Sequence, residues 1–357
     1  MAAIQALRGN FSNQVQGTTL FISSEPYVRE LAPHEVLVRI KACAVDIQKE
    51  KTYCQILSSS TKNCPIGHEV SGEILKVGPL VEDIYKEGTS VVGILPYDSN
   101  LSGCADLCIL HQYDLVEKPS SLSHEVAAAV VGTGLAAYTA IHYLGHVTAG
   151  DTVLVIDGAS PQGYLTIQVA QLWGAKVLTT YKTLADRQFI ESLKPPVAQI
   201  IELTQRSSIM SSSVAEETGG MGVDCVVDNG VRMFTSEEDI DLMDERLLRS
   251  VPHKSDIIAC LGFSGKWITS QSNLQLDPPN SEQLFLRGAS VSFLFPPAWT
   301  LTRAQHGRYH HVLKDLMERV VAGLIKCSNI ISTPIQNAPD VLMQKDLDST
   351  KSYIITF

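Results

Sequence analysis

The sequence predicts an α/β protein in which a β-rich section is joined to a doubly wound parallel sheet. Two observations carry this prediction. In the first third of the chain, short runs such as Glu35–Ile40 alternate polar and apolar residues, and glycines separate them. In the centre, unbroken apolar runs alternate with segments of helical spacing, which is typical of right-handed βαβ units. The 357 residues are enough for two domains.

Three strands and one helix are expected in the first third. Val70–Val77 and Ser90–Leu95 resemble Glu35–Ile40 in pattern, and the section ends near Lys118–Pro119. A helical pattern follows over Ser123–Val131, with Ser123 as the expected N-cap.

The centre begins with Thr152–Ile156, an apolar run typical of a parallel strand that is buried on both faces. Tyr164–Trp173 has helical spacing, and Gly174 follows at the expected C′ position. The same reasoning predicts the remaining elements, which are strands at Lys176–Thr180, Ile200–Leu203, Val223–Asp228 and Asp256–Leu261, helices at Asp186–Leu193 and His306–Ala322, and a last strand at Tyr353–Phe357.

The composition excludes several classes of protein. Hydrophobic residues make up 45% of the chain and charged residues 18%, so the chain has enough apolar material for a sizeable core and is not disordered. The formal net charge is −10, and no block of Lys or Arg occurs. We therefore expect neither a nucleic acid nor an anionic membrane surface as a partner, since both select basic surfaces.

Targeting signals and cysteine pairs are not evident. The N-terminal segment lacks the apolar core of a signal peptide, and the longest apolar stretch, Val126–Val131, is too short to span a bilayer. The eight cysteines include no CxxC pair, and their density is below that of a disulfide scaffold. We therefore expect a cytoplasmic protein with free thiols.

A glycine-bearing turn joins the first central strand to its helix. Gly158 and Gly163 match the first and third glycines of a dinucleotide-binding loop, and Ser160 stands at the middle position. Backbone N–H groups at such a helix N-terminus bind a pyrophosphate, and the Ser160 hydroxyl is a further donor. The alternative is an ordinary turn between a strand and a helix.

The second central strand indicates which nucleotide is bound. An acidic residue that would bind the NAD ribose is missing after Thr180, and Lys182 and Arg187 lie nearby. Two cations at this position favour a 2′-phosphate, and hence NADPH. The alternative is that both are ordinary solvated residues.

Several motifs, in order along the chain, resemble the medium-chain dehydrogenase/reductases. They are Pro65–Gly72, Gly88–Val91, Tyr138–Leu144 and Glu217–Asp228. The sequence is most similar to the quinone oxidoreductase branch. The resemblance implies a GroES-like catalytic domain from residues 1–122 and 296–357, a Rossmann domain from residues 123–295, NADPH as cofactor, and a homodimer.

The resemblance also implies which residues form the sites. Related reductases carry an Asn and a Tyr whose positions here are Asp46 and Lys51, with Tyr53 close by. These three are the candidate catalytic residues; the alternative is that Lys51 and Tyr53 are surface residues of a loop. The implied cofactor-binding residues are Gly158, Ala159, Ser160, Gly163, Lys182, Arg187, Asp228, Gly230, Leu261, Gly262 and Phe263.

A catalytic zinc is not expected. His68 and Glu69 match the corresponding segment of the zinc-dependent members, but the first ligand position is Asp46 and the second cysteine position falls near Ala129. The cysteine-rich lobe of those members is missing as well. We expect no metal, and interpret His68 as a hydrogen-bonded structural residue.

Two functions remain open. One is a zinc-independent, NADPH-dependent oxidoreductase that transfers hydride to a quinone or an α,β-unsaturated carbonyl. The other is a protein that binds NADPH but is catalytically weak, acting as a redox sensor or an interaction partner. The second is suggested by departures from the family pattern at Asp46, Lys51, Ala136 and Ser160.

Overall fold

The chain divides into two compact units. One is made from residues 1–135 and 296–357, and the other from residues 136–295. The computed structural model describes residues 4–11, 18–25, 30–58, 60–203, 207–233, 251–344 and 347–357. The domain boundary predicted at residues 122 and 123 lies just before helix α2 (His124–Tyr138), whereas the two units divide inside this helix. The exact domain limits stay a prediction.

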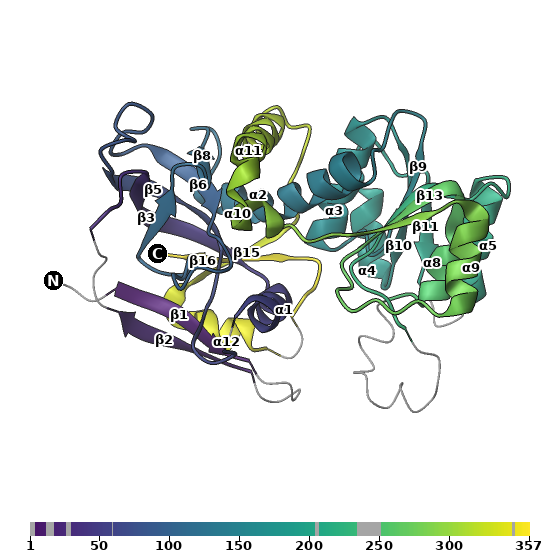
Figure 1. Cartoon of the computed structure of the whole chain (residues 1–357), viewed down its shortest axis with the longest axis horizontal. Helices are drawn as coiled ribbons and strands as arrows, with labels where there is room; N and C mark the ends of the chain where they lie inside the picture. The colour runs from purple at the N-terminus through teal and green to yellow at the C-terminus, as the bar shows by residue number, and fades with distance from the viewer. Residues whose placement is uncertain are drawn as a thin grey trace. The chain divides into compact units, whose positions relative to one another are not determined.

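The central unit contains the parallel sheet that the strand and helix alternation predicts (Figure 1). Its strands are β9 (Thr152–Val155), β10 (Lys176–Tyr181), β11 (Gln199–Glu202), β12 (Val223–Val227), β13 (Leu261–Thr269) and β14 (Ser290–Phe293). They lie in the order β11-β10-β9-β12-β13-β14, and every neighbouring pair is parallel. The order reverses between β9 and β12, which is where open α/β sheets bind their ligands, at the carboxyl ends of the strands.

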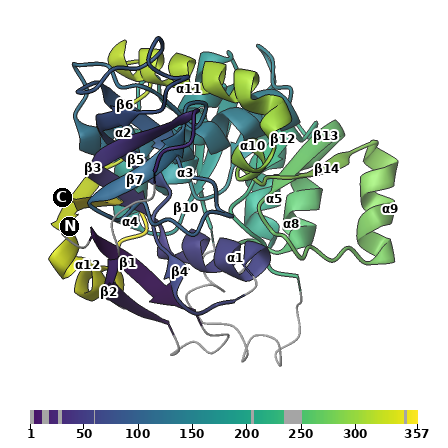
Figure 2. The ribbon, with the colours of Figure 1, turned by 60° about the vertical axis from the view of Figure 1, so that its left-hand side comes forward.

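Helices connect these strands and cover the sheet. They are α3 (Pro161–Leu172), α4 (Leu184–Glu191), α5 (Ser207–Glu217), α8 (Lys254–Cys260) and α9 (Pro278–Arg287), and a π-helix, Thr139–Leu144, continues α2. Helix α9 packs against β13 beside the sheet edge (Figure 2). The core between helices and sheet includes Leu154, Leu178 and Trp267, all fully buried.

One predicted strand of this unit is wrong. The segment Asp256–Leu261 is mostly helix, because His253 and Asp256 form a capping box at the start of α8. The His253 side chain accepts a hydrogen bond from the Ser255 N–H, and the Asp256 carboxylate accepts one from the His253 N–H. A short apolar run fits a strand and a buried helix equally well by periodicity. The actual strand, β13, starts at Leu261 and ends at Thr269.

The other unit holds two sheets. The larger one has the order β15-β16-β3-β5-β6-β8, with β7 paired to β3, and the smaller one is β2-β1-β4. The strands are β1 (Ile4–Asn10), β2 (Thr19–Glu25), β3 (Glu35–Val45), β4 (Cys64–Pro65), β5 (Glu69–Val77), β6 (Ser90–Ile94), β7 (Leu107–His111), β8 (Leu115–Glu117), β15 (Ile330–Pro334) and β16 (Ser352–Thr356). Strand β16 pairs antiparallel with β3, so the end of the chain completes the sheet that the first third begins.

Helices of this unit cover its sheets and carry the candidate catalytic residues. They are α1 (Ile47–Leu57), α10 (Ala298–Leu301), α11 (His306–Val321) and α12 (Ala338–Leu342), with the first part of α2. Ser123 accepts a hydrogen bond from the Val126 N–H, which confirms its predicted capping role. The predicted fold class, a β-rich unit joined to a doubly wound parallel sheet, is confirmed.

The prediction of free thiols throughout the chain is wrong at one pair. Cys54 and Cys64 form a disulfide whose Cα atoms are 6.6 Å apart, and it joins the end of α1 to β4. The two residues are ten positions apart, and only the turn between helix and strand brings them together, so their spacing gives no signal. Six other cysteines are free, and five of these are buried.

One helical segment passes a length and hydropathy test for a membrane span. It is His124–Leu144, where α2 continues into the π-helix, and 83% of its apolar window is buried inside the protein. This burial is what a core helix shows, and it gives the segment's apolar composition a structural explanation.

Candidate functional site

The turn between β9 and α3 is tight and specific to small residues. Asp157, at the end of the strand, has a left-handed backbone with φ of 61°. A Cβ at Gly158 would collide with the Thr179 hydroxyl, and one at Gly163 would collide with the carbonyl of Asp157. Ala159 between them is fully buried. Both glycines of the predicted phosphate loop are therefore needed for the chain to close this turn.

Ser160 acts as the N-cap of α3. Its hydroxyl donates to the Asp157 carbonyl at 2.7 Å and accepts from the Gly163 N–H at 3.1 Å. The Asn229 side-chain amide also donates to this hydroxyl, at 3.2 Å. The hydroxyl proton is thus held by the protein's own backbone, and the role of Ser160 in this structure is to shape the loop.

Lys182 and Asp157 form an ion pair beside this turn. Lys182 Nζ lies 2.8 Å from Asp157 Oδ2, and both side chains are mostly buried. Burial raises the pKa of the Asp157 carboxyl, and the charge of Lys182 opposes that rise. Lys182 was expected from the sequence to be a phosphate ligand or a solvated residue, and the structure shows that its charge and that of Asp157 compensate each other.

Arg187 forms an ion pair with a residue of its own helix, α4. Its Nε donates to Glu191 Oε1 at 2.9 Å, four residues on, and its guanidinium lies over the ring of Tyr181. The structure therefore does not bring Arg187 and Lys182 to one anion: each cation already has a carboxylate partner.

Asp228 is the hydrogen-bond centre at the carboxyl end of β12. Its buried carboxylate accepts from the indole of Trp267, from the hydroxyl of Thr269 at 3.0 Å and from the Gly230 N–H at 2.7 Å. Burial raises the pKa of Asp228 to about 6, and these donors lower it. Its oxygens are occupied by protein groups, so Asp228 positions the ends of β12 and β13.

Two residues near Asp228, Gln271 and Asn229, were not predicted from the sequence to belong to the site. Gln271 follows β13, and its side-chain oxygen accepts from the Val231 N–H at 3.3 Å. Asn229 reaches the phosphate turn through Ser160, and Gly230 next to it has φ of 120°. These residues share the carboxyl edge of the sheet with the turn after β9. Gln271 would have been recognised as a residue that follows the carboxyl end of a strand, had the strand been predicted to end at Thr269 instead of Leu261.

Leu261, Gly262 and Phe263 lie at the opposite edge of the sheet. In the parallel register, Leu261 is level with Val223 at the amino end of β12, whereas the cofactor turn follows the carboxyl end of β9. The resemblance implied these three residues as cofactor-binding, and the structure places them at the start of β13. The structure does not bring these three residues together with the phosphate turn.

In the other unit, Asp46 and Glu50 fix the start of α1. Asp46 is the N-cap, and its carboxylate accepts from the N–H groups of Gln48 and Lys49. Glu50 is buried, and its carboxylate accepts from the Gly67 N–H at 3.0 Å while lying 3.4 Å from His68 Nε2. This contact with Glu50 lies on one side of the His68 ring, and the other ring nitrogen, Nδ1, is buried without a hydrogen-bond partner among the described residues, so the expectation that His68 is hydrogen-bonded stays a prediction.

An aromatic stack connects His68 to one candidate catalytic residue. The His68 ring stacks on Tyr97 with centroids 3.9 Å apart, and Tyr97 meets Tyr53 edge to face at 4.7 Å. Burial raises the pKa of Tyr53 to about 12. Lys51 and Tyr53 lie on α1 and not in a loop, and both are half-buried; their catalytic role stays a prediction.

Asp46, Lys49, Glu50, His68 and Glu69 form a polar cluster around α1. Among the carboxyl groups of this cluster, the pKa of Glu69 is shifted the most. Burial raises its pKa to about 7, partly offset by the charge of Lys49, while Glu50 and Asp46 raise it further. A Cβ at Gly132 of α2 would collide with the Glu69 carboxylate, so the glycine makes room for this side chain. A group that titrates near neutral pH inside a polar cluster is suited to proton transfer. From the sequence, Glu69 was noted only as a match to the zinc-dependent members.

The residues present suit a dinucleotide and show no arrangement for a metal. The turn after β9, the N-terminus of α3 and the residues after β12 and β13 meet at one edge of the sheet, as dinucleotide binding requires. Among the residues that the structure describes, no group of three or more His, Cys, Asp or Glu is placed to hold a metal ion.

Comparisons with known proteins define the class. The profile of the alcohol dehydrogenase GroES-like domain matches residues 32–115. The CurK enoyl reductase covers 99% of both chains with a TM-score of 0.77 and 18% identity. A mycobacterial protein solved with NADPH covers 99% of this chain and 100% of its own, with a TM-score of 0.77 and 21% identity. At these identities the likeness shows the fold alone.

A closer relative defines the family. Mouse quinone oxidoreductase-like protein 1 is 41% identical over 291 residues, which are 82% of each chain. The chain therefore belongs to the family of quinone oxidoreductase-like protein 1 within the medium-chain dehydrogenase/reductases. The resemblance noted in the sequence is confirmed.

Replacing Asp228 by Asn tests the hydrogen-bond centre. Three donors meet a carboxylate there, and an amide offers one oxygen and a competing donor. We expect Asp228→Asn to lower the free energy of unfolding by about 2–4 kcal/mol, measured by urea denaturation at pH 7.5. The exposed Asp83→Asn is the control and should change it by less than about 0.5 kcal/mol. Equal stability of the two variants would contradict the assignment.

Proposed function

We propose that the protein is a zinc-independent, NADPH-dependent oxidoreductase that reduces a quinone or an α,β-unsaturated carbonyl. Membership of the family of quinone oxidoreductase-like protein 1 carries the proposal. The closed turn after β9 and the NADPH-bound structural neighbour support the cofactor. The polar cluster around α1 supports a reaction that also moves a proton.

The central unit provides the groups that would hold the cofactor. Gly158, Ala159, Ser160 and Gly163 present the N-terminus of α3 to the pyrophosphate, and Gly230 leaves the neighbouring strand end free of a side chain. NADPH, when bound, supplies a hydride. Asn229, Asp228 and Gln271 act through hydrogen bonds that fix this edge.

Lys182 is the proposed ligand of the 2′-phosphate. It lies at the end of β10, where the ribose of a dinucleotide is bound, and its charge is held in place by Asp157. Arg187, on the next helix, is the second proposed ligand. Its side chain is 50% exposed against 22% for Lys182, so solvent screens its charge more strongly and we expect its contribution to be the smaller one.

The α1 cluster provides the proposed proton source. Reduction of a quinone or an enone needs one proton for each hydride, and Glu69 is protonated at and below about pH 7. Lys49 faces the carboxylate that remains after the proton leaves and stabilises it. Asp46 keeps its role as the cap that positions α1, and Lys51 and Tyr53 remain proposed contacts of the acceptor.

A homodimer is proposed from the edge of the parallel sheet. Strand β14 is the last strand of the sheet, and Phe293 on it is 54% exposed. An exposed edge strand with an apolar side chain is suited to pairing with the same strand of a second copy.

The proposed function is tested by cofactor binding and turnover together. NADPH and NADH are titrated into the protein and followed by tryptophan fluorescence, and NADPH oxidation is then measured with a panel of small quinones and enones. We expect NADPH to bind more tightly than NADH and at least one acceptor to be reduced. Tight NADPH binding without turnover would favour the catalytically weak binding protein instead, and no binding of either nucleotide at millimolar concentration would refute both.

Lys182→Ala tests the cofactor preference. Because an ammonium group contacts a phosphate by a charge-assisted hydrogen bond, we expect the Kd for NADPH to rise about tenfold and the Kd for NADH to change little. Arg187→Ala is the matched variant and should have a smaller effect, since its more exposed charge is screened by solvent. If Lys182→Ala weakens both nucleotides equally, Lys182 does not bind the 2′-phosphate.

Glu69→Gln tests the proton source. In the wild type, kcat should fall as pH rises through about 7, because the acid form of Glu69 is lost. In Glu69→Gln we expect kcat to be about 100-fold lower at pH 6 and to lose this pH dependence, with an unchanged Kd for NADPH. Glu73→Gln, on the same strand, is the control. A Glu69→Gln enzyme that keeps the wild-type pH profile would exclude Glu69 as the acid.

A further inference from the structure

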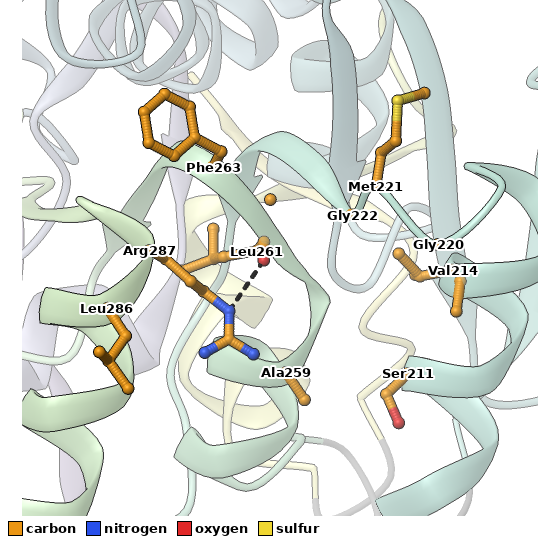
Figure 3. Close-up of a pocket in the computed structure, with 12 residues that line it drawn as sticks. Ser211, Val214, Gly220, Met221, Gly222, Ala259, Leu261, Phe263, Leu286 and Arg287 are labelled. Atoms are coloured by element: carbon orange, nitrogen blue, oxygen red, sulfur yellow. Dashed lines mark hydrogen bonds between the residues drawn. The ribbon is translucent and has the colours of Figure 1, made fainter.

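A pocket of about 280 Å³ lies at the amino edge of the parallel sheet (Figure 3). It is formed by the ends of α5, α8 and α9, the start of β13 and the loop Thr218–Gly222. Strand β13 runs nine residues from this edge to the edge proposed for the cofactor. Because β13 bulges, Leu261 and Ile268 lie level with Val223 and Val227 of β12, and at about 3.3 Å per residue the two edges are on the order of 13 Å apart. No residue of the turn after β9 lines the pocket, so the pocket is separate from the proposed nucleotide site.

Backbone forms one wall of the pocket. Gly220 and Gly222 have φ of 83° and 77°. A Cβ at Gly222 would lie 2.6 Å from the Gly262 nitrogen, and a Cβ at Gly262 would lie 2.5 Å from the Met221 carbonyl oxygen. The loop and the start of β13 approach too closely for side chains, which explains the glycines of the sequence motif here.

Arg287 carries the charge of the pocket. Its Nε donates to the Leu261 carbonyl at 3.1 Å, the contact drawn in Figure 3, and its Nη1 donates to the Gln283 carbonyl at 3.1 Å. Both acceptors are neutral, and within the described part of the chain no carboxylate forms an ion pair with this guanidinium. The two hydrogen bonds hold a half-buried positive charge at a fixed position, which is the requirement of an anion site.

Large apolar side chains surround this charge. Phe263 is 86% exposed, Met221 79% and Leu286 72%, and all three line the pocket. In Figure 3, Phe263 and Leu286 lie on the same side of the view as Arg287, and Met221 lies on the opposite side. Exposed apolar side chains gathered around a pocket indicate contact with an apolar ligand surface.

We propose that this pocket binds a small amphipathic anion: a carboxylate held by Arg287, with an apolar chain or ring covered by Phe263, Met221 and Leu286. A volume of about 280 Å³ has room for roughly nine groups of the size of a water molecule, which suits a chain of about eight carbons. The proposal does not depend on the proposed reaction, because neither NADPH nor an acceptor takes part in it.

Octanoate is the probe, and octan-1-ol is its neutral counterpart. Each is titrated calorimetrically into the full-length protein without nucleotide. We expect octanoate to bind at one site, Arg287→Gln to weaken it tenfold or more, and the weaker binding of octan-1-ol to change little. Arg308→Gln, at an exposed arginine of α11, changes the net charge equally and should leave octanoate binding unaltered.

A second variant tests the pocket without removing the arginine. Ala259 is exposed at the end of α8 and faces the pocket in Figure 3, so Ala259→Phe fills the space and should abolish binding of both probes. This variant decides the question if Arg287→Gln does not fold. Equal octanoate binding by Arg287→Gln and Arg308→Gln, unchanged binding by Ala259→Phe, or displacement of octanoate by NADPH would each overturn the proposal.

Discussion

The parallel register of β9, β12 and β13 is the constraint on which the rest of the central unit depends. It places Val155 beside Val227, and Val227 beside Ile268, so the residues that follow these three positions share one edge. Asp228 then connects the strand ends through Trp267 and Thr269, which lie on the neighbouring strand. Because a buried carboxylate is costly unless its oxygens are satisfied, these donors and the register stabilise each other.

How well the sequence predicts each element of this unit depends on whether recognisable turn or capping residues mark the ends of the element. Thr152–Ile156 is an unbroken apolar run followed by a glycine-bearing turn, and Tyr164–Trp173 is a regular helical pattern followed by Gly174; both elements form close to the expected limits. Asp256–Leu261 is short and apolar, and the capping box that decides for helix depends on a histidine, an unusual N-cap residue. That single error moved the end of this strand from Thr269 to Leu261.

Individual charges were predicted from the sequence, but their pairing was not. Lys182 and Asp157 are 25 residues apart and meet only because β9 and β10 lie side by side. Glu50 and His68 meet because the turn before β5 returns to α1. In each case a cation or an imidazole satisfies a buried carboxylate, which lowers the cost of burying it. The spacing along the chain contains no information about such pairs.

The two edges of the parallel sheet use glycine for different purposes. After β9, Gly158 and Gly163 let the strand turn directly into α3. The backbone N–H groups at the start of this helix are then available to bind an anion. Before β12 and β13, Gly222 and Gly262 let two backbones touch, and Arg287 bonds to the carbonyl beside them. A glycine-rich motif therefore does not identify a phosphate site by itself. What decides is whether the motif follows or precedes its strand. Only a motif that follows the carboxyl end of a strand lies at the edge where a dinucleotide binds.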